Sequence, residues 1–310
     1  MSDHVSHRRP DLQKVLAGAQ LPALPQSAMR LLEISRNPDN GPAEFARPIE
    51  ADPGLTSQVL CLVNSSYYGF AQEISSVKLA ISMVGVRTVR NFALWNAVFS
   101  LVPNPKCGPF HLKGLWQDSL RRALFARAIV GFLGIKEAED VFTAALLQDM
   151  AVPLLAKGWP AVYAKLLQAR NQGKTRLSVV EKQVFGWTHA DAAGMMARQW
   201  NLPEEFAVLV ESHLTLDRWA ATVPAEPAKF AMALSALLPS VADPVWTEHG
   251  LLEAAYEGIG RSKLPSLAEL LEQTDSQFER FAPVLKLSTP VKSLSDSLNE
   301  VAEPALAALS

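Results

Sequence analysis

The sequence predicts an all-α fold, and three observations support this prediction. Prolines, glycines and capping residues recur at the spacing of helix starts and stops along most of the 310 residues. No stretch of strand length alternates apolar and polar side chains with β-branched enrichment, as a half-buried strand would require. No repeat of fixed period is present, so a solenoid is not expected. Short connections between the expected helices are typical of a helical bundle.

The expected helices of the N-terminal third each have a recognisable start. Pro42 and Pro53 both suit a first helical turn, where the N–H that proline lacks has no partner, and Asp52 can cap the second helix. Ser76 can cap the next helix, and Gly85 separates it from a longer apolar run. After a first helix that begins near Pro42, the expected helices span residues 54–63, 77–84 and 86–101.

A segment rich in proline and glycine, residues 102–114, is expected to be a hinge between two helical halves. Beyond it, helices are expected over residues 115–133, 140–156, 178–186, 190–200, 204–214, 245–260 and 266–281. We expect Pro153 to bend or end the second of these helices. Ser178 and Glu181 have the spacing of a capping box at the start of the third.

In the C-terminal tail, an apolar stripe at helical spacing favours a helix that docks on its own domain. The stripe consists of Val291, Leu294, Leu298 and Val301. Docking on a partner or on a membrane surface is the alternative for such a stripe.

Composition excludes several classes of protein. The chain is 49% hydrophobic and 19% charged, which allows a substantial core, and its net charge of -2 carries no electrostatic signature of nucleic-acid binding. Cys61 and Cys107 form no Cys-x-x-Cys pair, so a zinc knuckle and a thioredoxin motif are excluded. No apolar segment follows the polar residues 1–10, and the apolar run 92–102 is shorter than the ~18–20 residues of a membrane span. We therefore expect a cytoplasmic protein without a membrane anchor.

Six motifs in order carry a family resemblance. The most specific is residues 62–69, Leu-Val-Asn-Ser-Ser-Tyr-Tyr-Gly. The others are residues 21–25, 49–56, 74–81, 84–91, and the pair 187–189 and 200–203. With these motifs the chain resembles the HDOD family, the catalytically degenerate relatives of the HD-domain phosphohydrolases.

The resemblance implies a domain organisation and a role. It implies an HDOD domain over residues 21–238, with an N-terminal helical part (21–102) and an HD-like helical part (115–238). Residues 1–20 would be an N-terminal extension, and residues 239–310 a C-terminal helical extension packed on the domain. Members of the family have regulatory or signalling roles in bacteria, often beside receiver or diguanylate cyclase domains, neither of which is visible in this chain.

The resemblance also places the positions of a lost metal site. An HD phosphohydrolase binds one or two divalent metals with histidine and aspartate side chains. The metal lowers the pKa of a bound water. Asp118 stands where the first histidine ligand would lie, and Gln148 with Asp149 stands in the place of the His-Asp pair. The later aspartate falls at or near Ser235. An amide is a poor replacement for imidazole, so the site is expected to be vestigial.

Two histidines remain downstream, His189 and His213, and with Asp118 and Asp149 they could form a crude metal site. The simpler interpretation makes His189 a capping or core-edge residue and His213 a surface or core-edge residue. Asp149 would then be a hydrogen-bonded buried acid or a helix-end acid. We accordingly expect no catalytic residue, no bound metal and no cofactor.

Other chemistry has weaker support. The helices 77–84 and 86–101 have helix-turn-helix proportions, and Arg87, Arg90 and Asn91 could reach DNA, but the second helix is rich in apolar residues typical of a core. Tyr67 and Tyr68 could contact a partner or close a helix end against the core. No glycine-rich phosphate loop and no nucleophile with a histidine and an acid in motif spacing are present.

The main hypothesis is a non-enzymatic bacterial signalling module that acts through contacts with an unidentified signalling protein or with a second copy of itself. The first alternative is a residual metal-dependent phosphohydrolase that acts on nucleotides or cyclic dinucleotides. The second alternative is a helix-turn-helix-like regulator that binds nucleic acid.

Overall fold

A computed structural model describes residues 9–18, 21–37, 39–220, 225–260 and 264–307 of the chain. These residues form α-helices and one short 3-10 helix but no strand, which confirms the predicted all-α fold. The helices are α1 (Leu12–Gly18), α2 (Gln26–Ser35), α3 (Pro42–Glu50), α4 (Pro53–Val63), α5 (Val77–Val84), α6 (Val86–Leu101), α7 (Leu112–Phe132), α8 (Ala138–Leu147), α9 (Ala151–Gly158), α10 (Pro160–Ala169), α11 (Leu177–Phe185), α12 (His189–Gln199), α13 (Glu204–Ser212), α14 (Leu216–Ala220), α15 (Pro227–Ser235), α16 (His249–Glu257), α17 (Leu267–Phe281), the 3-10 helix η1 (Ala282–Leu285) and α18 (Leu294–Ala307).

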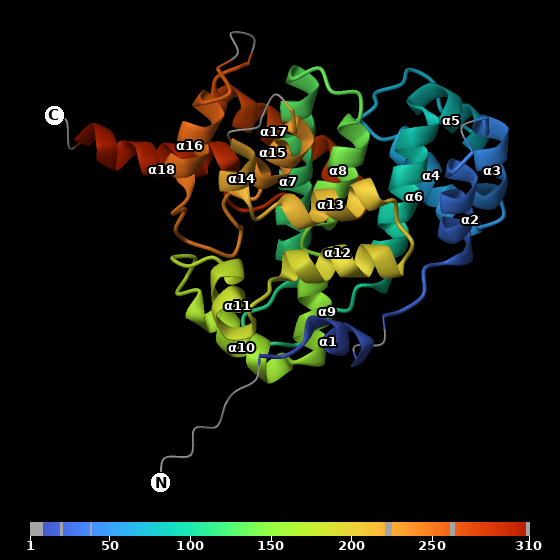
Figure 1. Cartoon of the computed structure of the whole chain (residues 1–310). Helices are drawn as coiled ribbons and strands as arrows, with labels where there is room; N and C mark the ends of the chain where they lie inside the picture. The colour runs from blue at the N-terminus through green and yellow to red at the C-terminus, as the bar shows by residue number, and fades with distance from the viewer. Residues whose placement is uncertain (1–8, 19–20, 38, 221–224, 261–263, 308–310) are drawn as a thin grey trace.

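The long helix α7 is the centre of the packing. It lies against α8, α15 and α17, whereas α2 to α6 pack mainly on one another and join the rest through α6 and α8. Figure 1 shows this N-terminal group on one side of α7 and α8, and α16 to α18 on the other. Helix α12 packs on α9 and α13, which brings segments from three parts of the chain to the middle of the molecule.

Predicted caps start several helices as expected. The side chain of Asp52 accepts a hydrogen bond from the backbone N–H of Leu55 (3.0 Å) at the start of α4. Ser76 caps α5 in the same way. Gly85 has a φ of 92°, which favours glycine, and this allows α6 to begin directly after α5.

The prediction of one helix over residues 140–156 is wrong. Helix α8 ends at Leu147 and α9 begins at Ala151, so the chain turns at residues 148–150. Pro153 neither bends nor ends the helix, because it lies in the first turn of α9, where the N–H would have no intrahelical partner. Asp149 therefore lies between the two helices, and its side chain belongs to the site described below.

The predicted capping box of Ser178 and Glu181 is also wrong. Helix α11 begins at Leu177, its N-cap is Arg176, and no side chain caps it. Glu181 is instead fully buried and accepts hydrogen bonds from the backbone N–H of His189 and from the hydroxyl of Tyr163. The helix expected over residues 245–260 is shorter, because α16 begins at His249.

The motif residues close loops and dock the N-terminal chain. The side-chain amide of Asn64 donates to the carbonyl of Ile74 (2.9 Å) and accepts from its N–H (2.7 Å), which closes the loop between α4 and α5. The indole N–H groups of Trp187 and Trp200 donate to the carbonyls of Pro10 and Pro22. Asn64, Trp187 and Trp200 of the motifs therefore have structural roles in this chain.

The predicted apolar stripe of the tail is confirmed for three of its four residues. Leu294 is fully buried, and Leu298 and Val301 pack against the core, but Val291 is fully exposed and does not belong to the stripe. Asp275 of α17 caps α18 by accepting from the N–H of Leu294 (3.0 Å). Helix α18 thus docks on α17.

One apolar stretch, residues 138–158, has the length and mean hydropathy of a membrane span, but 89% of it is buried inside the protein. It covers α8 and α9, which the turn at residues 148–150 separates. Burial of this kind is typical of core helices in a globular domain.

Candidate functional site

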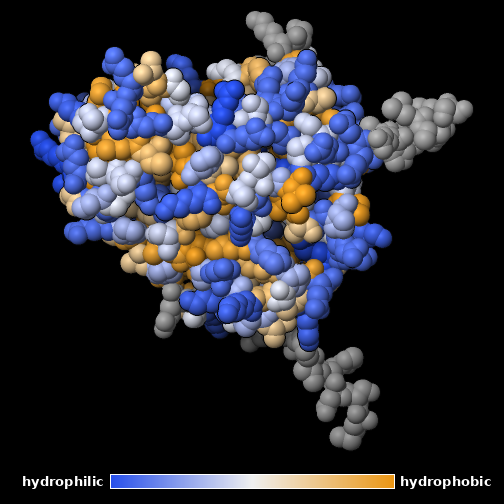
Figure 2. All heavy atoms as spheres, turned by 180° about the vertical axis from the view of Figure 1, so that it is seen from behind, coloured by the Kyte–Doolittle hydropathy of each residue, from blue (hydrophilic) through white to orange (hydrophobic). Residues whose placement is uncertain are grey.

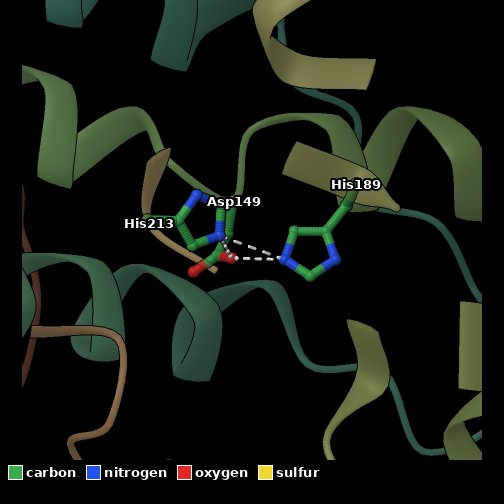
Figure 3. Close-up of side chains that lie close together, drawn as sticks. All are labelled: Asp149, His189 and His213. Atoms are coloured by element: carbon green, nitrogen blue, oxygen red, sulfur yellow. Dashed lines mark hydrogen bonds and ion pairs between the residues drawn. The ribbon is translucent and has the colours of Figure 1, made fainter. Parts of the chain in front are cut away.

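Three of the residues singled out in the sequence meet in the core. Asp149 lies in the turn after α8, His189 is the first residue of α12, and His213 follows the last residue of α13. The Oδ1 atom of Asp149 lies 3.2 Å from Nε2 of His189 and 3.7 Å from Nε2 of His213. The two Nε2 atoms are 3.3 Å apart, so one oxygen and two nitrogens face one another (Figure 3). All three residues are buried, so His213 is not the surface or core-edge residue expected.

The remaining ring nitrogens hold both imidazoles in place. Nδ1 of His189 lies 2.6 Å from the carboxylate of Glu181, and Nδ1 of His213 lies 2.6 Å from the carbonyl oxygen of Val210. The N–H of residue 189 also donates to Glu181, whose other oxygen accepts from the hydroxyl of Tyr163 (2.9 Å). Because a carbonyl only accepts, Nδ1 of His213 carries the proton and its Nε2 is an acceptor.

An arginine completes the centre. Arg122 of α7 donates to the Oδ2 atom of Asp149, and both side chains are largely buried. The two oxygens of Asp149 therefore face nitrogen atoms of two different side chains, Oδ2 that of Arg122 and Oδ1 that of His189.

The protonation states follow from these neighbours. Burial opposes the charge of Asp149, but Arg122 and His189 outweigh it and hold the pKa of this carboxyl well below its usual range. Burial also opposes the charge of His189, yet Glu181 and Asp149 raise its pKa to about 10. Burial lowers the pKa of His213 to about 3, and Asp149 only partly offsets this effect. At neutral pH, His189 is thus charged and His213 is neutral.

The spacing of the three donor atoms fits a metal, but their electrostatic setting does not. Adjacent ligands of a tetrahedral zinc ion, with bonds of ~2.0–2.1 Å, lie about 3.3 Å apart, close to the spacing of these three atoms. A metal would require His189 to lose its proton, and it would lie beside the fixed charge of Arg122. The geometry therefore permits a metal at these three atoms, and the charges of Arg122 and His189 oppose it.

A cavity of about 150 Å³ opens beside this centre. Asp149, His189 and His213 form part of its wall. The cavity also exposes Arg122 and Asp118, so the centre is accessible to small molecules from one side.

Asp118 lines the cavity but does not join the three converging residues. Its Oδ2 accepts from the hydroxyl of Ser240 (2.5 Å) and its Oδ1 accepts from the N–H of Val241 (2.8 Å). The carboxylate at the place of the first metal ligand thus anchors the loop that follows α15. Burial raises the pKa of Asp118.

The other two positions named from the resemblance, Gln148 and Ser235, do not line the cavity. Gln148 is fully buried, and neither polar atom of its amide has a hydrogen-bond partner in the described part of the chain. Ser235 donates to the carbonyl of Met232 within its own helix (2.8 Å). Neither residue is among the described residues that line the cavity.

The residues considered for DNA binding all contact one acid of the same chain, although the side chain of Arg87 stays 45% exposed. Arg90 and Asn91 of α6 both donate to Oδ1 of Asp140 (2.9 and 2.7 Å), and Arg87 forms an ion pair with the same carboxylate (3.3 Å). These contacts join α6 to α8. Helix α6 therefore serves as a packing element, as its apolar residues predict.

The loop tyrosines pack on the core. Tyr67 accepts a hydrogen bond from Arg127 and meets the ring of Phe281 edge to face at 5.0 Å. Tyr68 is half-buried beside it. In this structure both rings close the end of α4 against the core.

Sequence reasoning missed two residues of the centre, Arg122 and Glu181. Arg122 follows Asp118 by one helical turn, so both were bound to share a face of α7, and this spacing was an available signal. Glu181 carried a misleading signal, because its distance from Ser178 matched a capping box.

Comparison with known proteins defines the family. The model of the HDOD domain matches residues 21–216, which is more than half of the chain. The chain belongs to the HDOD family. This HDOD protein is also similar to an uncharacterized protein from Treponema pallidum (strain Nichols), with 24% identity over 197 residues. The match covers 62% of this chain and 38% of that relative, so the chain spans less than half of the relative's length.

Solved structures share the fold. An HDOD domain protein of unknown function from Geobacter sulfurreducens superposes with a TM-score of 0.69 at 23% identity, covering 90% of this chain and 99% of that one. A Shewanella amazonensis protein, provisionally described as a phosphohydrolase, gives a TM-score of 0.68 at 22% identity and covers 89% of this chain and 96% of its own. A Marinobacter aquaeolei protein, provisionally described as a signal transduction protein, gives 0.65 at 23% identity, covering 86% and 59%. At these identities the likeness establishes the fold alone.

Proposed function

We propose that this HDOD protein is a non-catalytic signalling module that acts through protein contacts in the bacterial cytoplasm. The observation that carries the proposal is the charge balance of the buried centre. Two cations, Arg122 and protonated His189, face two carboxylates, Asp149 and Glu181. The centre is therefore neutral without a metal.

This balance opposes hydrolysis of phosphate esters by the HD mechanism. That mechanism needs a divalent metal to lower the pKa of a water and to neutralise phosphate charge. Binding a metal here would expel the proton of His189 and leave one excess positive charge in a buried site, since Arg122 remains. The cost of that charge supports a structural role for Asp149 and both histidines.

The surface supports a role in binding other proteins. Figure 2 shows apolar side chains gathered between hydrophilic ones on the face opposite that of Figure 1. Large apolar side chains that are about half exposed include Met29 on α2 and Leu79 and Met83 on α5. Methionine is enriched in protein interfaces and adapts to different partners.

The proposal is tested by a hydrolysis assay on the intact chain. Bis(p-nitrophenyl) phosphate and AMP would be incubated with the protein and with Mn²⁺ or Zn²⁺, and the Asp149→Ala variant would serve as control. We expect equal, background rates for both proteins. A metal-dependent rate in the wild type that is lost in Asp149→Ala would overturn the proposal.

A second candidate function is a mononuclear metal-dependent phosphohydrolase. One observation favours it, namely the spacing of 3.2, 3.3 and 3.7 Å between the oxygen of Asp149 and the two Nε2 atoms. In addition, each histidine binds an oxygen through its other nitrogen, as metal-ligating histidines do. The same hydrolysis assay separates the two candidates.

A further inference from the structure

A loop without helical structure, residues 236–248, covers the cavity beside the centre. It joins α15 to α16 and is called the covering segment below (Figure 1). Nine of its residues line the cavity, among them Ser240, Asp243 and Glu248. The loop is therefore one wall of the cavity.

Three polar ties hold the covering segment on the cavity. Asp118 of α7 accepts hydrogen bonds from its residues 240 and 241. Arg170, just after α10, forms an ion pair with Asp243. Arg176, just before α11, donates to the carbonyl of residue 236 (3.0 Å) and lies 3.7 Å from the carboxylate of Glu248.

The charges that line the cavity depend on this segment. Three arginines line it, and so do four acids, of which Asp243 and Glu248 belong to the covering segment. Asp149 already pairs with Arg122 in the centre. Without the two acids of the covering segment, the charged lining would be three arginines, His189 and two aspartates, and Arg170 and Arg176 would lose the carboxylates that pair with them.

We propose that the cavity binds a small phosphate-bearing anion on Arg170 and Arg176, and that Asp243 and Glu248 occupy this site as internal competitors. Two guanidinium groups carry two positive charges, which match a phosphate dianion, and arginine binds phosphate with paired N–H groups. The ligand would replace the two carboxylates and release the covering segment from that wall.

Space is available for such a movement. The covering segment also lines a second hollow, of about 310 Å³, and residues 288–292 of the tail line the same hollow. That part of the tail is held on α7, where Gln117 donates to the carbonyl of Ser288 (2.7 Å). Displacement of the covering segment would thus change its contacts with the tail. Anion binding would in this way affect the C-terminal helices.

The inference rests on the proposed function in one respect, since a signalling module needs an input, but the two fail separately. Metal-dependent hydrolysis would overturn the proposed function and leave anion binding standing. A cavity that binds no anion would overturn this inference alone.

The test measures binding of inorganic phosphate and of AMP to the full chain by isothermal titration calorimetry at constant ionic strength, with acetate as a monoanion for comparison. We expect saturable binding of one or both phosphates and none of acetate. Binding should weaken about tenfold or more in the variant that combines Arg170→Gln and Arg176→Gln, because charge-assisted hydrogen bonds are lost. It should strengthen in the variant that combines Asp243→Asn and Glu248→Gln.

Controls use a matched ion-pair cluster outside the cavity. Arg198 pairs with Glu204 and Glu211 near the surface, so Arg198→Gln and Glu204→Gln change charge by the same amounts per site without touching the cavity. Both controls should bind phosphate like the wild type. Hydrogen exchange of residues 236–248 should accelerate when phosphate binds.

Three outcomes would overturn the inference. They are the absence of saturable phosphate binding in both the wild type and the variant lacking the two acids, equal effects of cavity and control variants, or binding that leaves exchange of residues 236–248 unchanged. The variant lacking the acids keeps both arginines, so the test stands even if the arginine variant does not fold.

Discussion

Replacing Arg122 by leucine tests whether an internal cation substitutes for a metal in this HDOD protein. The Arg122→Leu change leaves the carboxylate of Asp149 buried, with His189 as its remaining charged partner. Removal of one member of a buried ion pair costs about 3–5 kcal/mol, and we expect a loss near the lower limit because His189 remains. With an unfolding entropy of roughly 2.1 cal/mol/K per residue, about 3 kcal/mol lowers the Tm of a chain of this size by about 5 °C.

The variant should also bind a divalent cation, which we expect the wild type not to bind. Without the guanidinium, a divalent cation can neutralise Asp149, so Zn²⁺ should bind and stabilise the variant. At a free Zn²⁺ concentration of about 100 Kd the stabilisation is about 2.7 kcal/mol, enough to recover most of the lost Tm. The assay is thermal unfolding by circular dichroism, with and without Zn²⁺.

The adjacent arginine provides the control. Arg121 is also buried on α7, but it donates to the carbonyl of Lys292 and lies over the ring of Phe278, away from the centre. Arg121→Leu should lose stability without any recovery by Zn²⁺. An Arg122→Leu protein as stable as the wild type, or a wild type stabilised by Zn²⁺ as much as the variant, would refute the reasoning.

Three further predictions concern the same region. Gln148→Met should raise the free energy of unfolding by about 1–3 kcal/mol in urea titrations, because it removes a buried amide without partners; a loss of stability would show that the amide has one. Glu181→Gln should lower it by about 3 kcal/mol and lower the pKa of His189 measured by NMR, and an unchanged pKa would contradict the assigned pairing. The pKa of His213 is about 3, below its unfolded value of 6.5, so its contribution is complete above pH 6.5 and is lost as the pH falls toward 3; the stability difference between wild type and His213→Asn should shrink over that range, and a constant difference would refute the assignment.

The fold was largely predictable because its signals are local. Asp52, Ser76 and Ser266 start helices through contacts with residues three positions away, and Gly85 ends one through its own φ. Such signals are present in any short window of the sequence. The bounds of α4, α5 and α6 accordingly agree with the prediction to within one residue.

The errors in the fold arose where local signals were ambiguous. Residues 144–156 are almost uniformly apolar, so periodicity could not reveal the turn at residues 148–150. Pro153 was a misleading breaker, because its effect depends on where the helix begins.

The site was predictable only in part, because its decisive contacts are between distant residues. Asp149, His189 and His213 could be named from the resemblance, and they do converge. The roles of Arg122 and Glu181 depend on how α7 and α11 pack against the turn and α12, which no local pattern encodes. Asp118 likewise acts on a loop more than a hundred positions away.

The most direct test of the account is the metal content of the intact protein. The chain would be produced in medium supplemented with Zn²⁺, Mn²⁺ and Fe²⁺, dialysed, and analysed by inductively coupled plasma mass spectrometry beside Asp149→Ala. If Arg122 and His189 neutralise the centre, both proteins will contain metal far below one equivalent. One equivalent in the wild type, absent from Asp149→Ala, would contradict the account.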